Sequence, residues 1–157
     1  MVRILFVCLG NICRSTMAEF VFRDMAEKRG LGAQCTIASA GTSSEECGNP
    51  VHPGTRTKLA EHGISCKGKT AVQLTKQDYA QYDLLIGMEA ANIRSMLNIL
   101  GGDPEGKVHR LLHFASDERD IADPWFSGDF EATWQDVNEG CEGLMASLQQ
   151  AGKLRKR

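Results

Sequence analysis

The chain begins with a short apolar run in which polar and apolar side chains do not alternate. Ile4, Leu5, Phe6 and Val7 follow one another, and only Arg3 places a charge within residues 2–8. A strand with one face in water alternates apolar and polar side chains, whereas a strand of a parallel sheet covered by helices is apolar throughout. The run therefore predicts a strand over residues 2–8 that is buried on both faces.

Strand and helix patterns then alternate along the chain. An apolar stripe at helical spacing, with Met17, Val21 and Met25, follows the first strand and ends near Gly30. Further strands are predicted at residues 35–38, 82–86 and 107–114, and further helices at residues 56–62, 90–100 and 130–150. This order predicts a doubly wound α/β domain whose parallel strands are joined by right-handed crossovers.

The composition is that of an ordinary globular domain. A chain of 157 residues can bury its own core, and with 24% charged residues the formal net charge is only -2. Such a balance gives no reason to expect a nucleic-acid partner or a membrane partner. We expect one domain over residues 1–157, with residues 152–157 as a basic, solvated tail.

The sequence shows no pattern for secretion, membrane insertion or metal binding. No segment has the parts of a signal peptide, and no apolar run approaches the roughly 20 residues that span a bilayer, so we expect a cytoplasmic protein. The six cysteines are scattered and include no Cys-x-x-Cys pair. We therefore expect free thiols, no metal and no cofactor.

Small and polar residues form a tight turn directly after the first strand. In parallel sheets, ligands bind beyond the carboxyl ends of the strands, where the N-terminus of the next helix attracts anions. Gly10 allows the backbone to turn or to approach closely, and Asn11 tolerates a left-handed conformation, so successive N–H groups can form a nest. Arg14 adds a planar donor that matches two phosphate oxygens. The turn predicts a phosphate-binding loop.

Cys8 begins this loop and is a candidate nucleophile. Helix N-termini and nearby arginines favour ionisation of a thiol, so Cys8 is expected to be a thiolate. A lone cysteine at a strand end is more often a small buried apolar residue, but Gly10, Arg14 and Ser15 at these spacings favour the nucleophile. The loop is neither a Walker loop, which ends in Gly-Lys-Ser/Thr, nor a dinucleotide fingerprint, which has more glycines.

Residues 8–15, which read Cys-Leu-Gly-Asn-Ile-Cys-Arg-Ser, resemble the phosphate loop of the low-molecular-weight protein tyrosine phosphatases. The likeness extends over nearly the whole chain, because residues 39–42, 74–79, 88–92 and 123–124 resemble the later motifs of the family in family order. The resemblance implies a three-layer α/β/α fold with a flavodoxin-like sheet of four parallel strands in the order 2-1-3-4.

Asp123 is the candidate acid of the reaction that this resemblance implies. Attack by Cys8 on a phosphate ester produces a leaving oxygen that must be protonated. Asp-Pro alone usually marks a turn, but the family match favours catalysis, and Trp125 and Phe126 are expected to shield the carboxyl group. Arg14 is expected to bind the phosphate oxygens. Water would then cleave the phosphocysteine, with Asp123 acting as a base.

The resemblance also assigns supporting roles. Ser15 is expected to donate its hydroxyl to Cys8, and Asn11 and Ser39 to join a hydrogen-bond network that fixes the loop. Cys13 either forms a protective disulfide with Cys8 under oxidation or is a packed thiol. The predicted set is Cys8, Arg14 and Asp123 for catalysis, Leu9, Gly10, Asn11, Ile12, Cys13, Ser15 and Trp125 for phosphate and substrate binding, and Ser39 and Cys13 for support and redox protection.

The sequence departs from the family pattern at two places near the loop. Lys69 stands where many members have a histidine that completes the network; we expect Lys69 to point to solvent, with the network shorter or completed by His62 or water. Thr16 stands where a proline is usual, and with Glu19 it has the spacing of a capping box, so we expect it to cap the first helix.

The expected substrate is a tyrosine-phosphorylated protein, the product of a tyrosine kinase, with inorganic phosphate as an inhibitory product. Ile12 favours tyrosine, because phosphoarginine phosphatases of this fold carry a threonine there. Arsenate reductases need two further cysteines, and none lies between Lys67 and Cys141. A phosphocarrier domain has no use for Arg14 and Asp123 together, and a simple phosphate-binding module would leave the nucleophile and the acid unused.

Overall fold

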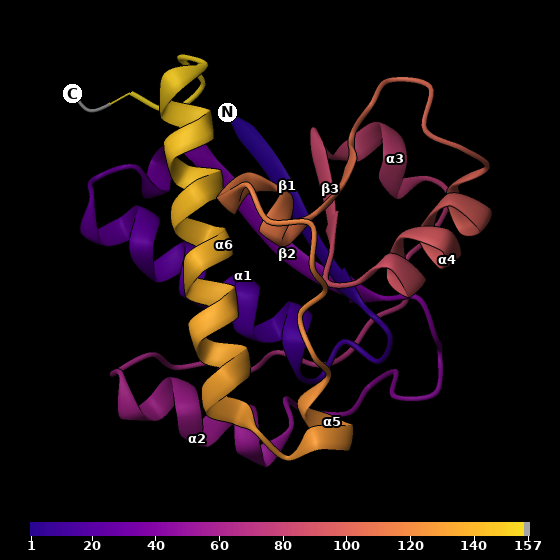
Figure 1. Cartoon of the computed structure of the whole chain (residues 1–157), viewed down its shortest axis with the longest axis vertical. Helices are drawn as coiled ribbons and strands as arrows, with labels where there is room; N and C mark the ends of the chain where they lie inside the picture. Colours follow the sequence, from indigo (N-terminus) through magenta and orange to yellow (C-terminus); the bar gives the residue numbers. More distant parts are fainter. Residues whose placement is uncertain (156–157) are drawn as a thin grey trace.

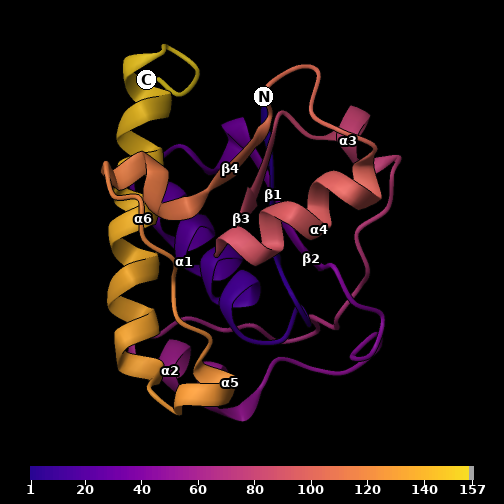
Figure 2. The ribbon, with the colours of Figure 1, turned by 45° about the vertical axis from the view of Figure 1, so that its right-hand side comes forward.

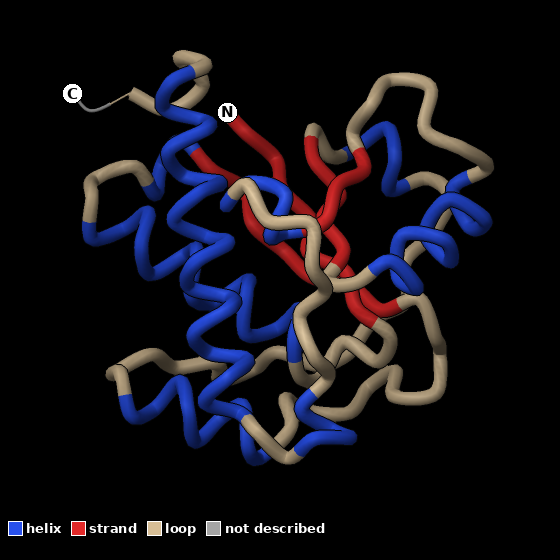
Figure 3. The backbone as a smooth tube through the Cα atoms, in the orientation of Figure 1, coloured by secondary structure: helices blue, strands red, loops and turns tan. Residues whose placement is uncertain are grey.

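A computed structural model, which describes residues 1–155, contains a central parallel sheet. Its strands are β1 (Val2–Cys8), β2 (Cys35–Gly41), β3 (Leu84–Gly87) and β4 (Val108–Arg110), drawn in red in Figure 3. All neighbouring strands pair in parallel, in the order β2-β1-β3-β4. The predicted strand order 2-1-3-4 is confirmed.

Helices cover both faces of this sheet, as Figure 1 and Figure 2 show. On one face lie α1 (Arg14–Lys28), α2 (Pro53–Glu61) and α6 (Phe130–Gln150), and on the other lie α3 (Asp78–Gln81) and α4 (Ala90–Leu100). The connections contain η1 (Gly32–Gln34), η2 (Leu111–Ala115) and the short helix α5 (Pro124–Ser127). The architecture is the predicted three-layer α/β/α arrangement.

β1 occupies the middle of the sheet and is buried on both faces. Ile4 and Phe6 belong to the apolar cluster that includes residues of α1 and α6, whereas Leu5 and Val7 belong to the cluster that includes residues of α4. Successive side chains of the strand point to opposite faces of the sheet, and helices cover both of these faces. The unbroken apolar run is therefore explained by burial in two layers rather than one.

The predicted strand over residues 107–114 is wrong in its second half, because η2 follows β4 directly. The reason lies in α6, which passes close to η2. A Cβ added to Gly140 would collide with the side chain of Leu111, and one added to Gly143 would collide with the carbonyl group of Phe114. These two glycines lower the intrinsic helix propensity, yet they allow α6 to pack against η2 without a break.

The expected cap at Thr16 is also wrong. α1 begins at Arg14, and the Thr16 hydroxyl donates to the Cys13 carbonyl oxygen at 2.9 Å. Glu19 contacts Ser39. Among the described residues, no side chain caps the N-terminus of α1, and the first turn of this helix carries no acidic residue. The N–H groups at this end of the helix therefore remain available to an anion.

The C-terminal segment is docked rather than solvated as far as the structure describes it. Leu154 is only 1% exposed and belongs to the main apolar cluster. Arg155 and Gln34 exchange two hydrogen bonds, with donor–acceptor distances of 2.7 and 3.0 Å. The expectation of a solvated tail over residues 152–157 is thus wrong for residue 154, and residues 156 and 157 lie outside the described part. Among residues 1–155, no helix is long and apolar enough to cross a bilayer.

Candidate active site

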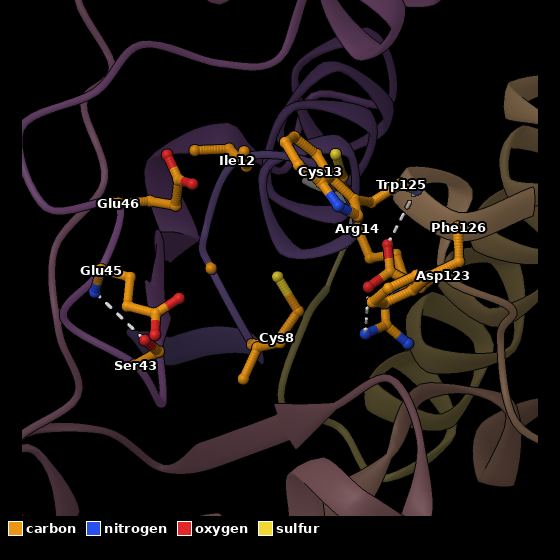
Figure 4. A pocket seen from close by; sticks show the side chains of 12 residues that line it. Cys8, Ile12, Cys13, Arg14, Ser43, Glu45, Glu46, Asp123, Trp125 and Phe126 are labelled. Atoms are coloured by element: carbon orange, nitrogen blue, oxygen red, sulfur yellow. Dashed lines mark hydrogen bonds and ion pairs between the residues drawn. The ribbon is translucent and has the colours of Figure 1, made fainter. Parts of the chain in front are cut away.

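A cavity of about 190 Å³ opens beyond the carboxyl end of β1 (Figure 4). It is lined by the loop after β1, by Ser43, Glu45 and Glu46 after β2, and by the start of α5. The structure brings these predicted site residues together there: Cys8, Leu9, Gly10, Ile12, Cys13, Arg14, Asp123 and Trp125. The other three, Asn11, Ser15 and Ser39, are buried and do not line the cavity. This position is the usual ligand-binding edge of a parallel sheet.

The loop is held closely against the end of β2. The N–H of Thr42 donates to the Cys8 carbonyl oxygen and the N–H of Ser43 to that of Leu9, both at 2.9 Å. A Cβ at Gly41 would come within 2.8 Å of the Leu9 carbonyl oxygen. Gly41 is therefore needed for the close approach of the loop to β2, a requirement that only the tertiary structure reveals.

Asn11, rather than Gly10, makes the left-handed turn of the loop. The φ of Asn11 is 59°, which confirms the conformation predicted for it, whereas Gly10 does not have a positive φ. Gly10 instead lets the loop pass near Glu46, because a Cβ at Gly10 would lie 3.3 Å from Glu46 Cγ. Of the two roles that the sequence allows for Gly10, close approach is the one observed.

The Cys8 sulfur lies among hydrogen-bond donors. The Asn11 N–H donates to Sγ at 3.3 Å, and Ser15 Oγ lies 3.0 Å from Sγ. Cys8 is buried in the core cluster on one side and lines the cavity on the other. Sγ therefore has two polar contacts within the loop.

A buried network supports the loop from behind. Asn11 Nδ2 donates to Ser15 Oγ and to Ser39 Oγ, each at 2.9 Å, and Asn11 Oδ1 accepts from the N–H of Val72 at 3.1 Å. Ser39 belongs to β2, which ends at Gly41. The strand predicted over residues 35–38 was too short to include it. The expected network of Asn11, Ser15 and Ser39 is present.

The network continues to Lys69, which corrects the expectation that this residue points to solvent. Lys69 Nζ donates to the Ser39 carbonyl oxygen at 3.0 Å and lies 3.9 Å from Glu19 Oε1, and the side chain is only 14% exposed. The buried carboxylate of Glu19 provides the attraction. His62 does not take part, because its ring stacks on Trp134 with 3.9 Å between centroids.

Arg14 lies at the first turn of α1 and is held by three oxygen atoms. Its Nη1 donates to the Ile121 carbonyl oxygen at 2.9 Å, and its Nη2 contacts Glu89 Oε1 at 3.1 Å and Asp123 Oδ2 at 3.3 Å. The guanidinium group is 1% exposed, so these contacts fix its direction. Sequence reasoning missed this contact of Glu89; the only signal was its place in a segment, residues 88–92, that resembles a family motif.

Asp123 caps α5 and reaches the same cavity as Cys8. Its Oδ1 accepts from the N–H of Trp125 at 3.1 Å, and its Oδ2 pairs with Arg14. The carboxyl group is 17% exposed, whereas Trp125 and Phe126 are 57% and 79% exposed. The two aromatic residues therefore stand at the rim of the cavity, and they shield Asp123 only in part.

The rim of the cavity has an aromatic side and an acidic side, which Figure 4 places opposite each other. Trp125 contacts the His52 ring edge-on, with 5.5 Å between centroids, and sequence reasoning missed this support. Glu45 and Glu46 line the other side. Ile12 contributes an apolar wall and belongs to a small cluster with Cys13 and Ala71.

Comparison with known proteins identifies the family of this site. The family described as low molecular weight phosphotyrosine protein phosphatase matches residues 3–154. The chain belongs to this family. The match includes the phosphate loop, the network behind it and the segment of Asp123, so the resemblance inferred from the sequence is confirmed.

Relatives within this phosphatase family extend over the same length. The low molecular weight protein-tyrosine-phosphatase YfkJ of Bacillus subtilis is 44% identical over 156 residues, which is 98% of this chain and 100% of that protein. The crystal structure of YfkJ has a TM-score of 0.93 at 43% identity and covers 96% of each chain. A low molecular weight protein tyrosine phosphatase from Streptococcus pyogenes has a TM-score of 0.85 at 35% identity and covers 94% of this chain and 93% of its own.

The fold is shared beyond proteins named as tyrosine phosphatases. The crystal structure of DARP, a drosophila arginine phosphatase, has a TM-score of 0.83 at 25% identity, and it covers 93% of this chain and 97% of its own. The fold therefore does not by itself distinguish a tyrosine phosphatase from an arginine phosphatase.

Cys13 is a second thiol in the cavity of this phosphatase family member. Burial, together with the nearby charges of Cys8 and Asp123, raises the pKa of Cys13 to about 12. Both Cys8 and Cys13 are free cysteines in the structure. At neutral pH, Cys13 therefore remains a protonated thiol beside the Cys8 sulfur.

Proposed function

We propose that the chain folds as one phosphatase domain that hydrolyses phosphotyrosine and aryl phosphate monoesters through a phosphocysteine intermediate. The observation that carries the proposal is the convergence of Cys8, Arg14 and Asp123 on one cavity at the N-terminus of α1. A nucleophile, an oxyanion clamp and an acid are the three groups that this reaction needs.

In the first half of the reaction, the phosphate group binds to Arg14 and to the N–H groups of the loop. The dianion competes with Asp123 for Arg14 Nη2, which frees the carboxyl group to face the leaving oxygen. The Cys8 thiolate forms a bond to phosphorus while the bond from phosphorus to the phenolic oxygen breaks. Asp123 donates a proton to that oxygen, and tyrosine leaves as a neutral phenol.

In the second half, water attacks the phosphorus atom of the phosphocysteine. Asp123, now ionised, accepts a proton from this water, and the bond between sulfur and phosphorus breaks. The hydroxyl group of Ser15, 3.0 Å from the sulfur, stabilises the departing thiolate. Inorganic phosphate leaves, and because it fits the same loop it inhibits the enzyme as a product.

The shape of the cavity favours phosphotyrosine over phosphoarginine. Ile12 and Trp125 offer apolar surfaces to an aromatic ring, and Ile12 lacks a hydroxyl group for a guanidinium. A protein phosphorylated by a tyrosine kinase is therefore the proposed partner. Arsenate reduction, phosphate carriage and simple phosphate binding have no observation in the structure that favours them.

Peptides that carry phosphotyrosine, phosphoarginine or phosphoserine test this choice. We expect phosphotyrosine to give a kcat/KM about 100-fold higher than either alternative, the size of discrimination that a fitted pocket provides. Release of inorganic phosphate from three peptides with the same flanking sequence measures the ratio. Faster release from the phosphoarginine peptide would contradict the substrate assignment and leave the cysteine mechanism standing.

Cys13 is proposed to protect Cys8 from irreversible oxidation. Peroxide converts the Cys8 thiolate to a sulfenic acid and releases hydroxide, and the Cys13 thiol then forms a disulfide with Cys8 and releases water. We expect peroxide-treated enzyme to recover most of its activity with dithiothreitol, and Cys13→Ala to recover several-fold less. Cys47→Ala, at an exposed free cysteine, is the matched control. Equal recovery in Cys13→Ala and Cys47→Ala would contradict this role.

A further inference from the structure

A cluster of charged residues lies behind the phosphate loop, and none of the proposed catalytic steps uses it. Glu19 and Arg23 belong to α1, and Lys69 lies in the connection between α2 and α3. Glu19 is buried, Lys69 is largely buried and Arg23 is partly exposed. Buried charges are costly unless their partners are well placed. The partners of Glu19 and Lys69 therefore indicate what the cluster does.

The two cations hold the backbone of β2 on either side of Ala38. Arg23 Nη2 donates to the Ile37 carbonyl oxygen at 2.6 Å and to Glu19 Oε2 at 2.7 Å. Lys69 Nζ donates to the Ser39 carbonyl oxygen at 3.0 Å and lies 3.9 Å from Glu19 Oε1. Ser39 is thus fixed in position next to the carboxylate of Glu19.

This arrangement sets the direction of the Ser39 hydroxyl group. Ser39 Oγ hydrogen-bonds to Glu19 Oε1, and an ionised carboxylate accepts hydrogen bonds but does not donate them. The Ser39 hydroxyl therefore donates to Glu19. Its oxygen remains free to accept, and Asn11 Nδ2 is the donor that it faces, at 2.9 Å.

Asn11 and Ser15 continue this order of donors and acceptors from Ser39 to Cys8. The N–H of Val72 donates to Asn11 Oδ1, which assigns Nδ2 to the side of the two serines. Asn11 Nδ2 uses one hydrogen for Ser39 Oγ and the other for Ser15 Oγ. Ser15 Oγ accepts from Asn11, and Cys8 Sγ, 3.0 Å away, is a neighbour to which the Ser15 hydroxyl can donate its own hydrogen.

We infer that Lys69 is a positioning residue of the active site, which together with Glu19 orients the Ser15 hydroxyl group toward the Cys8 thiolate. The inference rests on the proposed function, because it gives Lys69 a role in chemistry at Cys8. Lys69 supplies a positive charge to the Glu19 carboxylate and a hydrogen bond to the backbone of Ser39, so its removal loosens both contacts of Ser39.

The electrostatics of the cluster agree with this role. Burial lowers the pKa of Lys69 from its ordinary value, and the nearby Glu19 opposes that effect. Arg23, on the other side of Glu19, lowers the pKa of Lys69 further. The Glu19 carboxylate therefore favours the charged form of Lys69, and the Lys69 ammonium group in turn attracts the carboxylate.

Lys69→Met tests the inference, because methionine keeps much of the length and apolar stem of lysine and removes its charge. We expect kcat for an aryl phosphate to fall about tenfold while KM changes less than twofold, since a hydrogen bond to a charged group is lost in the reaction and not in substrate binding. The midpoint of the pH dependence of Cys8 alkylation by iodoacetamide, followed at Cys8 by peptide mass spectrometry, is expected to rise by about one pH unit. Lys67→Met, at an exposed neighbouring lysine, is the matched control and should behave as the unchanged protein.

Two further variants separate positioning from a general loss of structure. Glu19→Gln keeps the shape of the side chain but provides an amide that can donate to Ser39. It should therefore lower kcat and raise the alkylation midpoint as Lys69→Met does. If Lys69→Met does not fold, Glu19→Gln provides the test. In a Ser15→Ala background, Lys69→Met should cost little more, because Lys69 acts through Ser15. Independent, additive losses would overturn the inference.

The outcomes of this test are distinct from those of the proposed function. Equal kcat and equal alkylation midpoints in Lys69→Met and Lys67→Met would overturn the role of Lys69 while phosphatase activity remained. An unchanged protein that fails to turn over aryl phosphates would instead overturn the proposed function itself.

Discussion

Replacing Cys8 with serine is expected to abolish turnover of aryl phosphates while phosphate binding is retained. A serine hydroxyl does not ionise near neutral pH, so the bond to phosphorus cannot form at a useful rate. Loss of a nucleophile from a catalytic unit lowers kcat by a factor on the order of 10⁶. The N–H groups of the loop and Arg14 do not depend on the sulfur atom, and they should still bind phosphate. Release of p-nitrophenol and calorimetric titration with phosphate measure the two properties.

Cys47→Ser is the matched control for this substitution, because it makes the same chemical change at an exposed cysteine that does not line the cavity. It should keep the full rate. Turnover by Cys8→Ser within tenfold of the unchanged protein would show that another group attacks phosphorus. Loss of phosphate binding together with turnover would indicate that the loop had changed its shape.

Replacing Asp123 with asparagine is expected to slow hydrolysis of a phenyl phosphate by about 100- to 10,000-fold, the range for a positioned general acid. Asparagine can still accept from the N–H of Trp125 and cap α5, so the local fold should persist. It cannot donate a carboxyl proton to the leaving oxygen. Single-turnover measurements of phenol release follow this first step directly.

Two substrates with different leaving groups test the role of Asp123 as an acid most directly. A nitrophenol leaves without a proton, so the loss caused by Asp123→Asn should shrink for p-nitrophenyl phosphate compared with phenyl phosphate. Glu118→Gln, at an exposed position in the same segment, serves as the control. Equal losses for both substrates would indicate that Asp123 positions the phosphate and does not protonate the leaving oxygen.

Much of the fold could be predicted from the sequence, because burial leaves a local pattern. The apolar run of β1 indicated a strand covered on both faces, and the helices predicted over residues 90–100 and 130–150 are observed with these bounds as α4 and α6. The end of β4 could not be predicted. An apolar residue such as Leu111 fits a buried strand as well as it fits η2. Only its packing against Gly140, which is distant in the sequence, favours η2.

The loop after β1 could be predicted as part of the candidate site for a different reason. Cys8, Asn11, Arg14 and Ser15 lie within eight residues, so one short segment contains most of the groups on which the prediction rested. Asp123 is distant in sequence, and it was found only through the family resemblance and the need for an acid. The structure places its carboxylate 3.3 Å from Arg14.

The sequence by itself determined the parallel α/β fold, the close grouping of Cys8, Arg14 and Ser15 after β1, and the family, because each depends on residues that are close together or on a periodic pattern. Only the tertiary structure decided the surroundings of Lys69, the partners of Arg14 and the need for Gly41. Lysine is ordinarily a solvated residue, and nothing in its local sequence marks it as buried. Its burial depends on Glu19, fifty residues earlier, whose carboxylate is brought to the same place by the packing of α1 against β2.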